Sequence, residues 1–426
     1  MSSFEAQYLV EARKYEIEKI LSFVTKSQSC QLISVPGAGR ATVLRLLAFN
    51  KKLVEHHLKE DRKKYLFIYS NFAECGSFET EELHKFLFYS LLNILEENGE
   101  LKTKVYELFT EALNLKDGLV LFQSLKKAME LLAKEDLVPV FLFDRFSEFA
   151  NQTSNRFFSD LKTLRTASGG KLAIVFSTHR PLEELLSAEI WKDFWEFFVG
   201  NHIFLQLHDS VTTDFRLSIL EKEYGKVIPK EERGEITRLT GGHGKLTKLS
   251  AQLLLSETET IPKEKVRTFL LSHILIQGAL LEVWDSLMQA EQAALKEKKE
   301  TELLKNLGLP FPLLSDFIEQ RVKEKLIPKE IRFEEKDNEI YFGDDPIAGL
   351  TSYEFKLLQF LIKNPERLLS KDEIIVYVWS DEKTNQGVSD EALSQMIHRL
   401  RKKVEDESES PKHILTVKGR GIRFIP

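Results

Sequence analysis

The chain has 426 residues, and its 60 Lys plus Arg against 66 Asp plus Glu give a net charge of −6. This length fits about two to four domains, and a hydrophobic fraction of 42% allows each domain to build a core. The composition excludes a mainly disordered chain and a uniformly basic protein that coats nucleic acid by charge alone, although a small basic surface remains compatible with it.

The first half of the chain is predicted to form an α/β domain. An amphipathic helix is expected over 4–26, and three helical stretches fall between 78 and 135. Apolar runs predict five strands, at 30–35, 64–70, 138–144, 171–178 and 202–207. Strands that alternate with helices in this way form a parallel sheet that is covered on both faces.

After residue 208 the predicted elements are helical, and we expect a helical lid or a small helical domain. The helices are predicted at 212–224, 230–239, 244–257, 264–284 and 286–305. From 328, short strand-like pieces precede three helical segments, and 414–426 predicts a β-hairpin with glycines at 419 and 421. The domains are therefore expected at 1–208, 209–327 and 328–426.

The number of cysteines indicates which disulfide or zinc sites are possible, and the apolar runs indicate whether a segment could enter a membrane. Cys30 and Cys75 are too few for a disulfide framework or a four-ligand zinc site. The N-terminus shows no basic segment followed by an apolar one, and the longest apolar stretch, 267–282, is interrupted by His273 and Gln277. We expect a cytoplasmic protein with no membrane partner.

A glycine-rich segment at 34–42 (SVPGAGRAT), here called the glycine loop, lies between a predicted strand and a predicted helix. A P-loop has the pattern Gly-x4-Gly-Lys-[Ser/Thr], in which backbone N–H groups surround phosphates, Lys reaches them and the hydroxyl binds magnesium. Here Arg40 stands in place of the lysine and Ala41 in place of the hydroxyl. Thr42 comes one residue late, about 100° further around the helix.

Other features have the order found in nucleotide-binding folds. Asp144 ends one apolar run, Ser177 and Thr178 end the next, and a Thr-Gly-Gly-His-Gly-Lys turn occupies 240–245. Over about residues 1–310 this order resembles the P-loop NTPases of the AAA+/STAND group. The resemblance implies a set of nucleotide-binding residues: Gly37, Gly39, Arg40, Thr42 and Asp144.

Two interpretations of the glycine loop stay open. Either it still binds ATP or ADP, the only cofactor that the pattern suggests, or it is a tight strand–helix turn that has lost nucleotide. Arg180 is expected to sense phosphate in the first case and to be solvated otherwise. No catalytic or metal-ligating set is recognised, and the departures at Arg40 and Ala41 predict weak or absent ATPase activity.

The segment 349–426 carries the most specific pattern. Thr351 with Glu354, and Ser370 with Glu373, predict capping boxes at the starts of two helices. The segment resembles the OmpR/PhoB-type winged helix-turn-helix through several motifs, which are LT at 350–351, EF at 354–355, LL at 357–358, Leu368, SK at 370–371, VW at 378–379, RLRKK at 399–403 and TVKGRGIRF at 416–424. This resemblance implies an α+β DNA-binding domain after the P-loop sheet and its lid.

The predicted third helix, 389–405, separates into two faces. The core face is expected to hold Leu393, Ile397, Leu400 and Val404. Opposite it lie side chains suited to a major groove, and the hairpin tip adds cations for minor groove or phosphate. The predicted DNA-binding residues are Gln395, His398, Arg399, Arg401, Lys402, Lys418 and Arg420. Residues 391–426 carry a net charge of +3, so the basic character is local.

These patterns support three hypotheses. The first is a sequence-specific transcription regulator that binds double-stranded DNA, with an N-terminal NTPase-like module for nucleotide-dependent control or self-association. The second is a STAND-type ATPase or signalling protein whose winged helix is a docking module. The third is a scaffold in which both modules bind proteins.

Overall fold

The structure of the chain is a computed structural model. It describes residues 4–95, 99–150, 152–259, 261–323, 333–336, 339–342, 345–347, 349–365, 367–379, 390–405, 411–417 and 421–425. The chain folds into two compact units, residues 1–320 and 321–426, and each unit is described by itself. The finer boundaries expected at 208 and 327 stay predictions.

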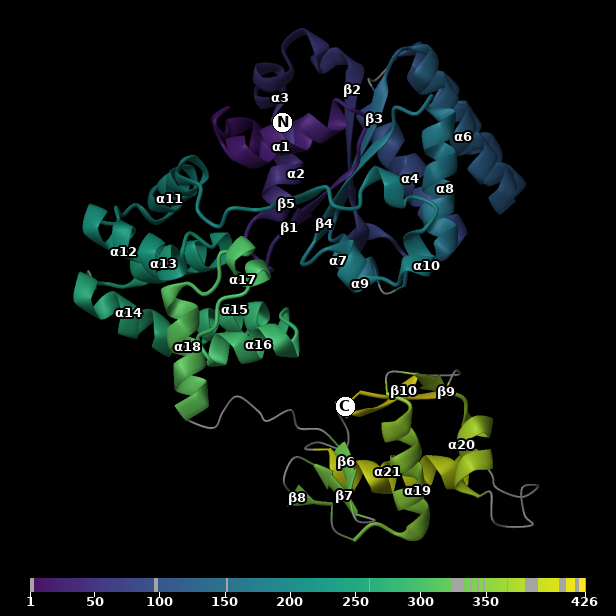
Figure 1. Cartoon of the computed structure of the whole chain (residues 1–426), viewed down its shortest axis with the longest axis vertical. Helices are drawn as coiled ribbons and strands as arrows, with labels where there is room; N and C mark the ends of the chain where they lie inside the picture. Colours follow the sequence, from purple (N-terminus) through teal and green to yellow (C-terminus); the bar gives the residue numbers. More distant parts are fainter. Residues whose placement is uncertain are drawn as a thin grey trace. The chain divides into compact units, whose positions relative to one another are not determined.

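The first unit is built on a five-stranded sheet (Figure 1). Its strands are β1 (Cys30–Ile33), β2 (Tyr65–Asn71), β3 (Val138–Asp144), β4 (Ala173–Thr178) and β5 (His202–Phe204). All pairs are parallel, in the order β2-β3-β4-β1-β5. The predicted parallel sheet is therefore confirmed, and β1 lies inside it, so the glycine loop leaves from the interior of the sheet's carboxyl edge.

Helices cover both faces of this sheet. They are α1 (Lys14–Val24), α2 (Arg40–Phe49), α3 (Lys51–Leu58), α4 (Thr80–Ile94), α5 (Glu100–Leu115), α6 (Gly118–Lys134), α7 (Phe146–Ala150), α8 (Asn155–Ala167), α9 (Leu182–Leu185) and α10 (Ala188–Trp191). Helices α1 to α3 lie on one side and α4, α6 and α8 on the other (Figure 1). Buried phenylalanines of β3 and β4 pack against the second group, because these central strands are buried on both faces.

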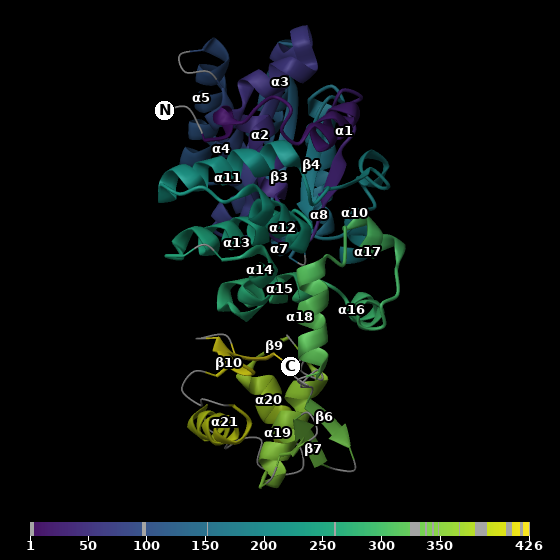
Figure 2. The ribbon, with the colours of Figure 1, turned by 90° about the vertical axis from the view of Figure 1, so that its left-hand side faces the viewer.

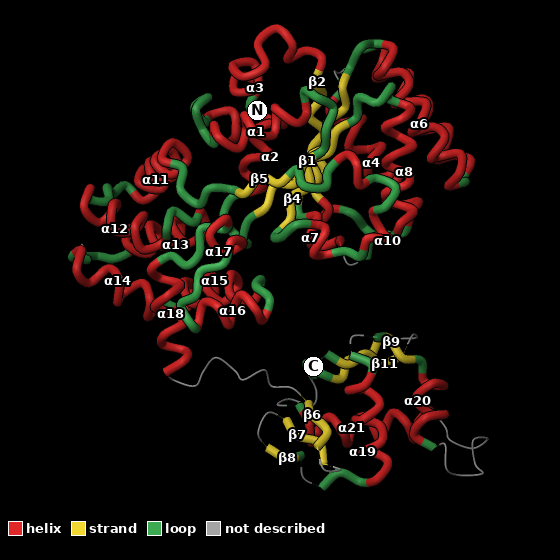
Figure 3. Tube along the Cα trace, viewed as in Figure 1, coloured by secondary structure: helices red, strands yellow, loops and turns green. Residues whose placement is uncertain are grey.

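A helical segment follows β5 in the same unit. Its helices are α11 (Ser210–Tyr224), α12 (Lys230–Thr240), α13 (Gly244–Ser256), α14 (Lys263–Ser272), α15 (Ile274–Asp285), α16 (Gln289–Lys296), α17 (Glu302–Asn306) and α18 (Pro312–Lys323). Helix α13 packs between α11 and α15 (Figure 2), and the described part of this segment is helix and loop only (Figure 3).

Several predicted helices are shorter or divided. The helix expected over 4–26 begins only at Lys14, because Arg13 adopts a left-handed conformation with φ 54°. His273 divides the segment 264–284, since its side chain caps the start of α15. Lys298, also at positive φ, ends α16, and Thr301 then caps the separate helix α17. Helix α18 was not predicted.

The second unit places three helices between two small antiparallel sheets. Its elements are β6 (Phe333–Lys336), β7 (Glu339–Phe342), β8 (Asp345–Pro346), α19 (Ser352–Lys363), β9 (Leu368–Leu369), α20 (Lys371–Val378), α21 (Asp390–Val404), β10 (Ile414–Val417) and β11 (Gly421–Phe424). Both predicted capping boxes are present at the starts of α19 and α20. Strands β10 and β11 form the predicted hairpin, called the wing hairpin below, and β11 also pairs with β9.

Gly421 is required by this pairing. Its φ is +139°, and a Cβ atom there would lie 2.0 Å from the backbone oxygen of Leu369. A side chain would therefore separate β11 from β9.

No single helix among the described residues is long and apolar enough to cross a membrane. The pair α14 and α15 passes the test of length and composition together, but the two helices are bent by 70° at His273.

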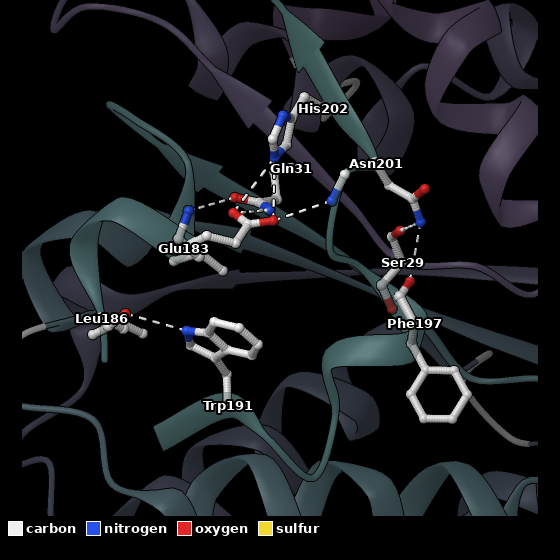
Figure 4. A network of polar contacts seen from close by, with 10 residues as sticks. Ser29, Gln31, Glu183, Leu186, Trp191, Phe197, Asn201 and His202 are labelled. Atoms are coloured by element: carbon white, nitrogen blue, oxygen red, sulfur yellow. Dashed lines mark hydrogen bonds and ion pairs between the residues drawn. The ribbon is translucent and has the colours of Figure 1, made fainter. Parts of the chain in front are cut away.

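A polar network attaches the short edge strand β5 to the rest of the sheet (Figure 4). The carboxylate of Glu183 accepts from Gln31 Nε2 at 2.9 Å and from the backbone nitrogen of Gly200 at 3.1 Å. His202 Nε2 lies 3.2 Å from the same carboxylate. Burial raises the pKa of Glu183, but the bonds from His202 and Gln31 outweigh it and hold the pKa at about 2.

Glu183→Gln is expected to remove stability that depends on pH. Because the folded pKa lies below the ordinary value, the carboxylate stabilises the fold above about pH 4.5, and the effect is lost as pH falls towards 2. A shift of this size corresponds to at most about 3 kcal/mol at neutral pH, and solvent screening of the half-buried carboxylate reduces this to about 1–2 kcal/mol. Denaturant unfolding between pH 2 and pH 7 measures it, with exposed Glu189→Gln on α10 as control. If the free energy of unfolding fell as steeply between pH 4.5 and pH 2 in Glu183→Gln as in the wild type, this role would be contradicted.

Candidate functional site

The glycine loop leaves β1 and enters α2 at Arg40, as expected for a P-loop. The Arg40 side chain, however, turns back into the protein, where Nη1 donates to the backbone oxygens of Ser34 and Thr178. Burial lowers the pKa of Arg40 to about 10, against the attraction of the Asp144 and Glu148 carboxylates. The guanidinium thus joins the carboxyl ends of β1 and β4.

An open cavity of about 890 Å³ lies at this edge of the sheet, between the glycine loop and α15. Four of the five residues predicted to bind nucleotide line it: Gly37, Gly39, Arg40 and Asp144. Asp144 accepts from the hydroxyl of Tyr69 at 2.6 Å and from the backbone nitrogen of Arg145 at 2.9 Å. Burial and this carboxylate raise the pKa of Tyr69, so the phenol stays a donor.

Thr42, the fifth residue, faces away from that cavity. Its Oγ1 accepts from Arg216 Nη2 at 2.7 Å, and Arg216 Nε donates to the Tyr8 hydroxyl at 2.8 Å. Beside them, Arg13 Nη2 donates to the oxygen of Ala38 at 3.3 Å. The two arginines leave a pocket of only about 20 Å³ behind the glycine loop.

The turn at 240–245, here called the lid turn, lies directly against the glycine loop. His243 Nε2 lies 2.8 Å from the oxygen of Pro36, and the backbone nitrogen of Lys245 donates to the oxygen of Gly37 at 2.9 Å. Burial lowers the pKa of His243 to about 4, so the ring is neutral at pH 7. A Cβ on Gly37, whose φ is +76°, would lie 2.9 Å from both His243 and Lys245. This contact therefore depends on glycine.

These residues do not fit a nucleotide bound with magnesium. Ala41 lines the cavity where a hydroxyl ligand is needed, and its side chain has no oxygen. The Arg40 guanidinium is engaged with two backbone oxygens, and Asp144 is engaged with Tyr69. The described residues of the cavity thus lack the arrangement that magnesium-dependent hydrolysis requires.

Two contacts of this region were not predicted. Arg180 was expected to sense phosphate or to be solvated, but it is 2% exposed and its Nη2 pairs with Glu291 of α16 at 2.9 Å. The glycines of the lid turn were recognised, but not its bond to the glycine loop. Both contacts join residues more than 100 positions apart. The periodicity of helices and strands gives no information about such long-range contacts.

In the second unit, α21 shows the two predicted faces. The core face is confirmed, since Leu393, Ile397, Leu400 and Val404 are all buried, together with Met396. Gln395, His398, Arg399 and Lys402 are exposed on the opposite side. The exposed face carries bidentate hydrogen-bonding groups and cations, which are the groups that contact base edges and phosphates.

The other cations of α21 have protein partners. Arg401 Nε donates to the oxygen of Ile414 on β10 at 2.9 Å. Lys403 Nζ donates to the buried carboxylate of Glu354 on α19 at 2.7 Å. Arg399 remains 61% exposed, with Nε 3.9 Å from the same carboxylate. Burial raises the pKa of Glu354, but the bond from Lys403 and others outweigh it and lower the pKa overall.

Lys418 and Arg420, the two predicted contacts of the hairpin tip, lie outside the described residues. The strand ends that flank them, Val417 and Gly421, are paired with each other.

The sequence of residues 345–424 matches the family described as "Transcriptional regulatory protein, C terminal". The phosphate regulon transcriptional regulatory protein PhoB of Klebsiella pneumoniae is 33% identical over 103 residues, 24% of this chain and 43% of that protein. Response regulator MprA of Mycolicibacterium vanbaalenii is 42% identical over 83 residues, 20% of this chain and 34% of that protein. This chain therefore spans less than half the length of these relatives.

The C-terminal unit thus carries an OmpR/PhoB-type winged helix DNA-binding domain of transcription regulators. Among solved structures, a Walker-type ATPase of Pyrococcus abyssi is 16% identical, covers 78% of this chain and 93% of its own, and has a TM-score of 0.39. Drosophila ORC bound to DNA has a TM-score of 0.35 at 15% identity, covering 90% of this chain and 84% of its own. With TM-scores below 0.5, neither structure adds to what the strand order and the glycine loop show, which is a parallel α/β unit with a strand–loop–helix turn after β1.

Proposed function

We propose that the whole chain is a sequence-specific transcription regulator. Helix α21 enters the major groove of double-stranded DNA, and the wing hairpin contacts the minor groove or the backbone through Lys418 and Arg420. The observation that supports this most directly is the exposed face of α21, where Gln395, Arg399 and Lys402 lie opposite a fully buried apolar face.

The proposal includes self-association of the chain. The net charge of residues 391–426, which include α21 and the wing hairpin, is only +3. One winged helix domain alone therefore binds DNA weakly through charge. Two winged helix domains that bind two half-sites together would have a higher overall affinity, without any new contact to DNA. The glycine loop of the first unit is bonded to other residues of the same chain. We propose that this first unit forms the contact between the two copies of the chain.

Selection of bound fragments from a random double-stranded DNA pool tests the function, with and without ATP and magnesium. We expect one enriched sequence. If two winged helix domains bind together, this sequence should occur twice, with centres about 10–11 base pairs, or a multiple of this, apart. We also expect the same sequence in both conditions, because the cavity does not fit magnesium-nucleotide. A pool without enrichment would overturn the proposal and favour a winged helix that docks proteins.

A further inference from the structure

Arg401, near the end of α21, is bonded to the start of the wing hairpin, here called its root, at Ile414–Thr416. Its Nε and Nη2 donate to the backbone oxygen of Ile414 at 2.9 and 2.6 Å. Nη2 also donates to Thr416 Oγ1 at 2.7 Å. The guanidinium thus contacts the first and third residues of β10 from a helix that was predicted to use this side chain on DNA.

Glu405, the residue after α21, holds the same strand from its nitrogen side. Its carboxylate accepts from the backbone nitrogens of Lys412 at 2.7 Å, His413 at 2.9 Å and Ile414 at 2.7 Å. Bonds in which one partner is charged are about twice as strong as neutral ones. The nitrogen and the oxygen of Ile414 are therefore both bound by charged side chains four positions apart on one helix end.

Lys403 attaches the same helix end to the body of the domain. Its Nζ donates to Glu354 at 2.7 Å and to the oxygen of Gly349 at 2.6 Å. The orientation of α21 on α19 and the position of β10 on α21 are thus fixed by neighbouring residues of a single turn.

We propose that Arg401 and Glu405 are positioning residues that set the position of strand β10, and so of the wing hairpin, relative to the exposed face of α21. This rests on the proposed function. Val417, the end of β10, lies three residues beyond Ile414, about 10 Å from it at about 3.3 Å per residue. A tilt of β10 by about 10° about Ile414 would move the end of the strand by about 2 Å, which breaks a hydrogen bond of ordinary length.

Arg401→Met in the full chain tests the proposal on a DNA site recovered by selection. A hydroxyl-radical footprint is compared with those of the wild type and of Lys418→Ala plus Arg420→Ala, which defines the protection that the wing gives. We expect Arg401→Met to lose the wing protection and keep that of α21. Affinity for the selected site should fall at least tenfold, while affinity for random DNA changes less than twofold. Glu405→Gln should give the same footprint.

The salt dependence of binding separates positioning from phosphate contact. Loss of one phosphate contact lowers the slope of log K against log salt by about 0.9, and Lys402→Met, the exposed neighbour, should show this change. In the Lys418→Ala plus Arg420→Ala background, where the wing contacts are already absent, adding Arg401→Met should leave the slope unchanged. A slope reduced as in Lys402→Met, or an intact wing footprint, would overturn the positioning role. A wild type without sequence preference would instead overturn the proposed function itself.

Discussion

Arg40→Ala is expected to lower the free energy of unfolding of the first unit by about 3–5 kcal/mol with no nucleotide present. The variant removes the side-chain donor from the backbone oxygens of Ser34 and Thr178 at the ends of two central strands. Of these two oxygens, only that of Thr178 keeps another donor among the described residues, the backbone nitrogen of Ser34 at 3.2 Å. It also removes the cation that faces Asp144, which is 4% exposed. Urea or guanidinium unfolding, followed by far-ultraviolet circular dichroism, measures the loss.

Arg145→Ala is the matched control. Arg145 lines the same cavity and carries the same charge, but its side chain is 52% exposed and pairs with the exposed Glu148 at 2.8 Å. A surface ion pair of this kind contributes about 1 kcal/mol or less. Equal losses in the two variants would show that charge in the cavity, and not the bonds of Arg40 to the two backbone oxygens, stabilises the unit.

Arg40→Lys restores the residue that a P-loop requires and so separates the two interpretations of the glycine loop. A single ammonium group cannot reproduce the planar fork of a guanidinium, so we expect Arg40→Lys to be destabilised too. ATP with magnesium should leave the midpoint of thermal unfolding unchanged in the wild type and in this variant. A variant as stable as the wild type, with a midpoint that rises with ATP, would contradict the structural role.

The sequence alone was sufficient for those features that depend on near neighbours along the chain. The five apolar runs correspond to the five parallel strands, because strands of a sheet that is covered on both faces are rich in apolar residues. Both capping boxes and the buried face of α21 were also predicted, since each depends on residues three or four apart.

Contacts between distant segments were not predictable in this way. The left-handed Arg13 divides a segment whose periodicity is continuous, and its side chain lies against Ala38 of the glycine loop. Arg180 finds Glu291, 111 positions away, and a lone charged residue gives no indication of such a partner. Arg401 likewise has a helical position close to that of solvated cations, and only the place of β10 shows that it bonds within the protein.

Gln395→Ala together with Arg399→Ala is expected to weaken binding to the selected DNA site by at least about 30-fold, since each base contact gives about 1–3 kcal/mol of discrimination. Both side chains are exposed on α21, so their removal leaves the core of the domain unchanged. Glu354, which lies 3.9 Å from Arg399, keeps its closer partner Lys403. Electrophoretic mobility shift at fixed salt measures the affinity.

Lys363→Ala is the control for the loss of a cation, because Lys363 is an exposed residue on α19 rather than on α21. We expect this variant to bind the selected site nearly as the wild type does. The double variant should still bind random DNA within a few-fold of the wild type, since most phosphate contacts remain. If it bound the selected site as tightly as the wild type, α21 would not be the helix that reads the sequence, and the major-groove assignment would be wrong.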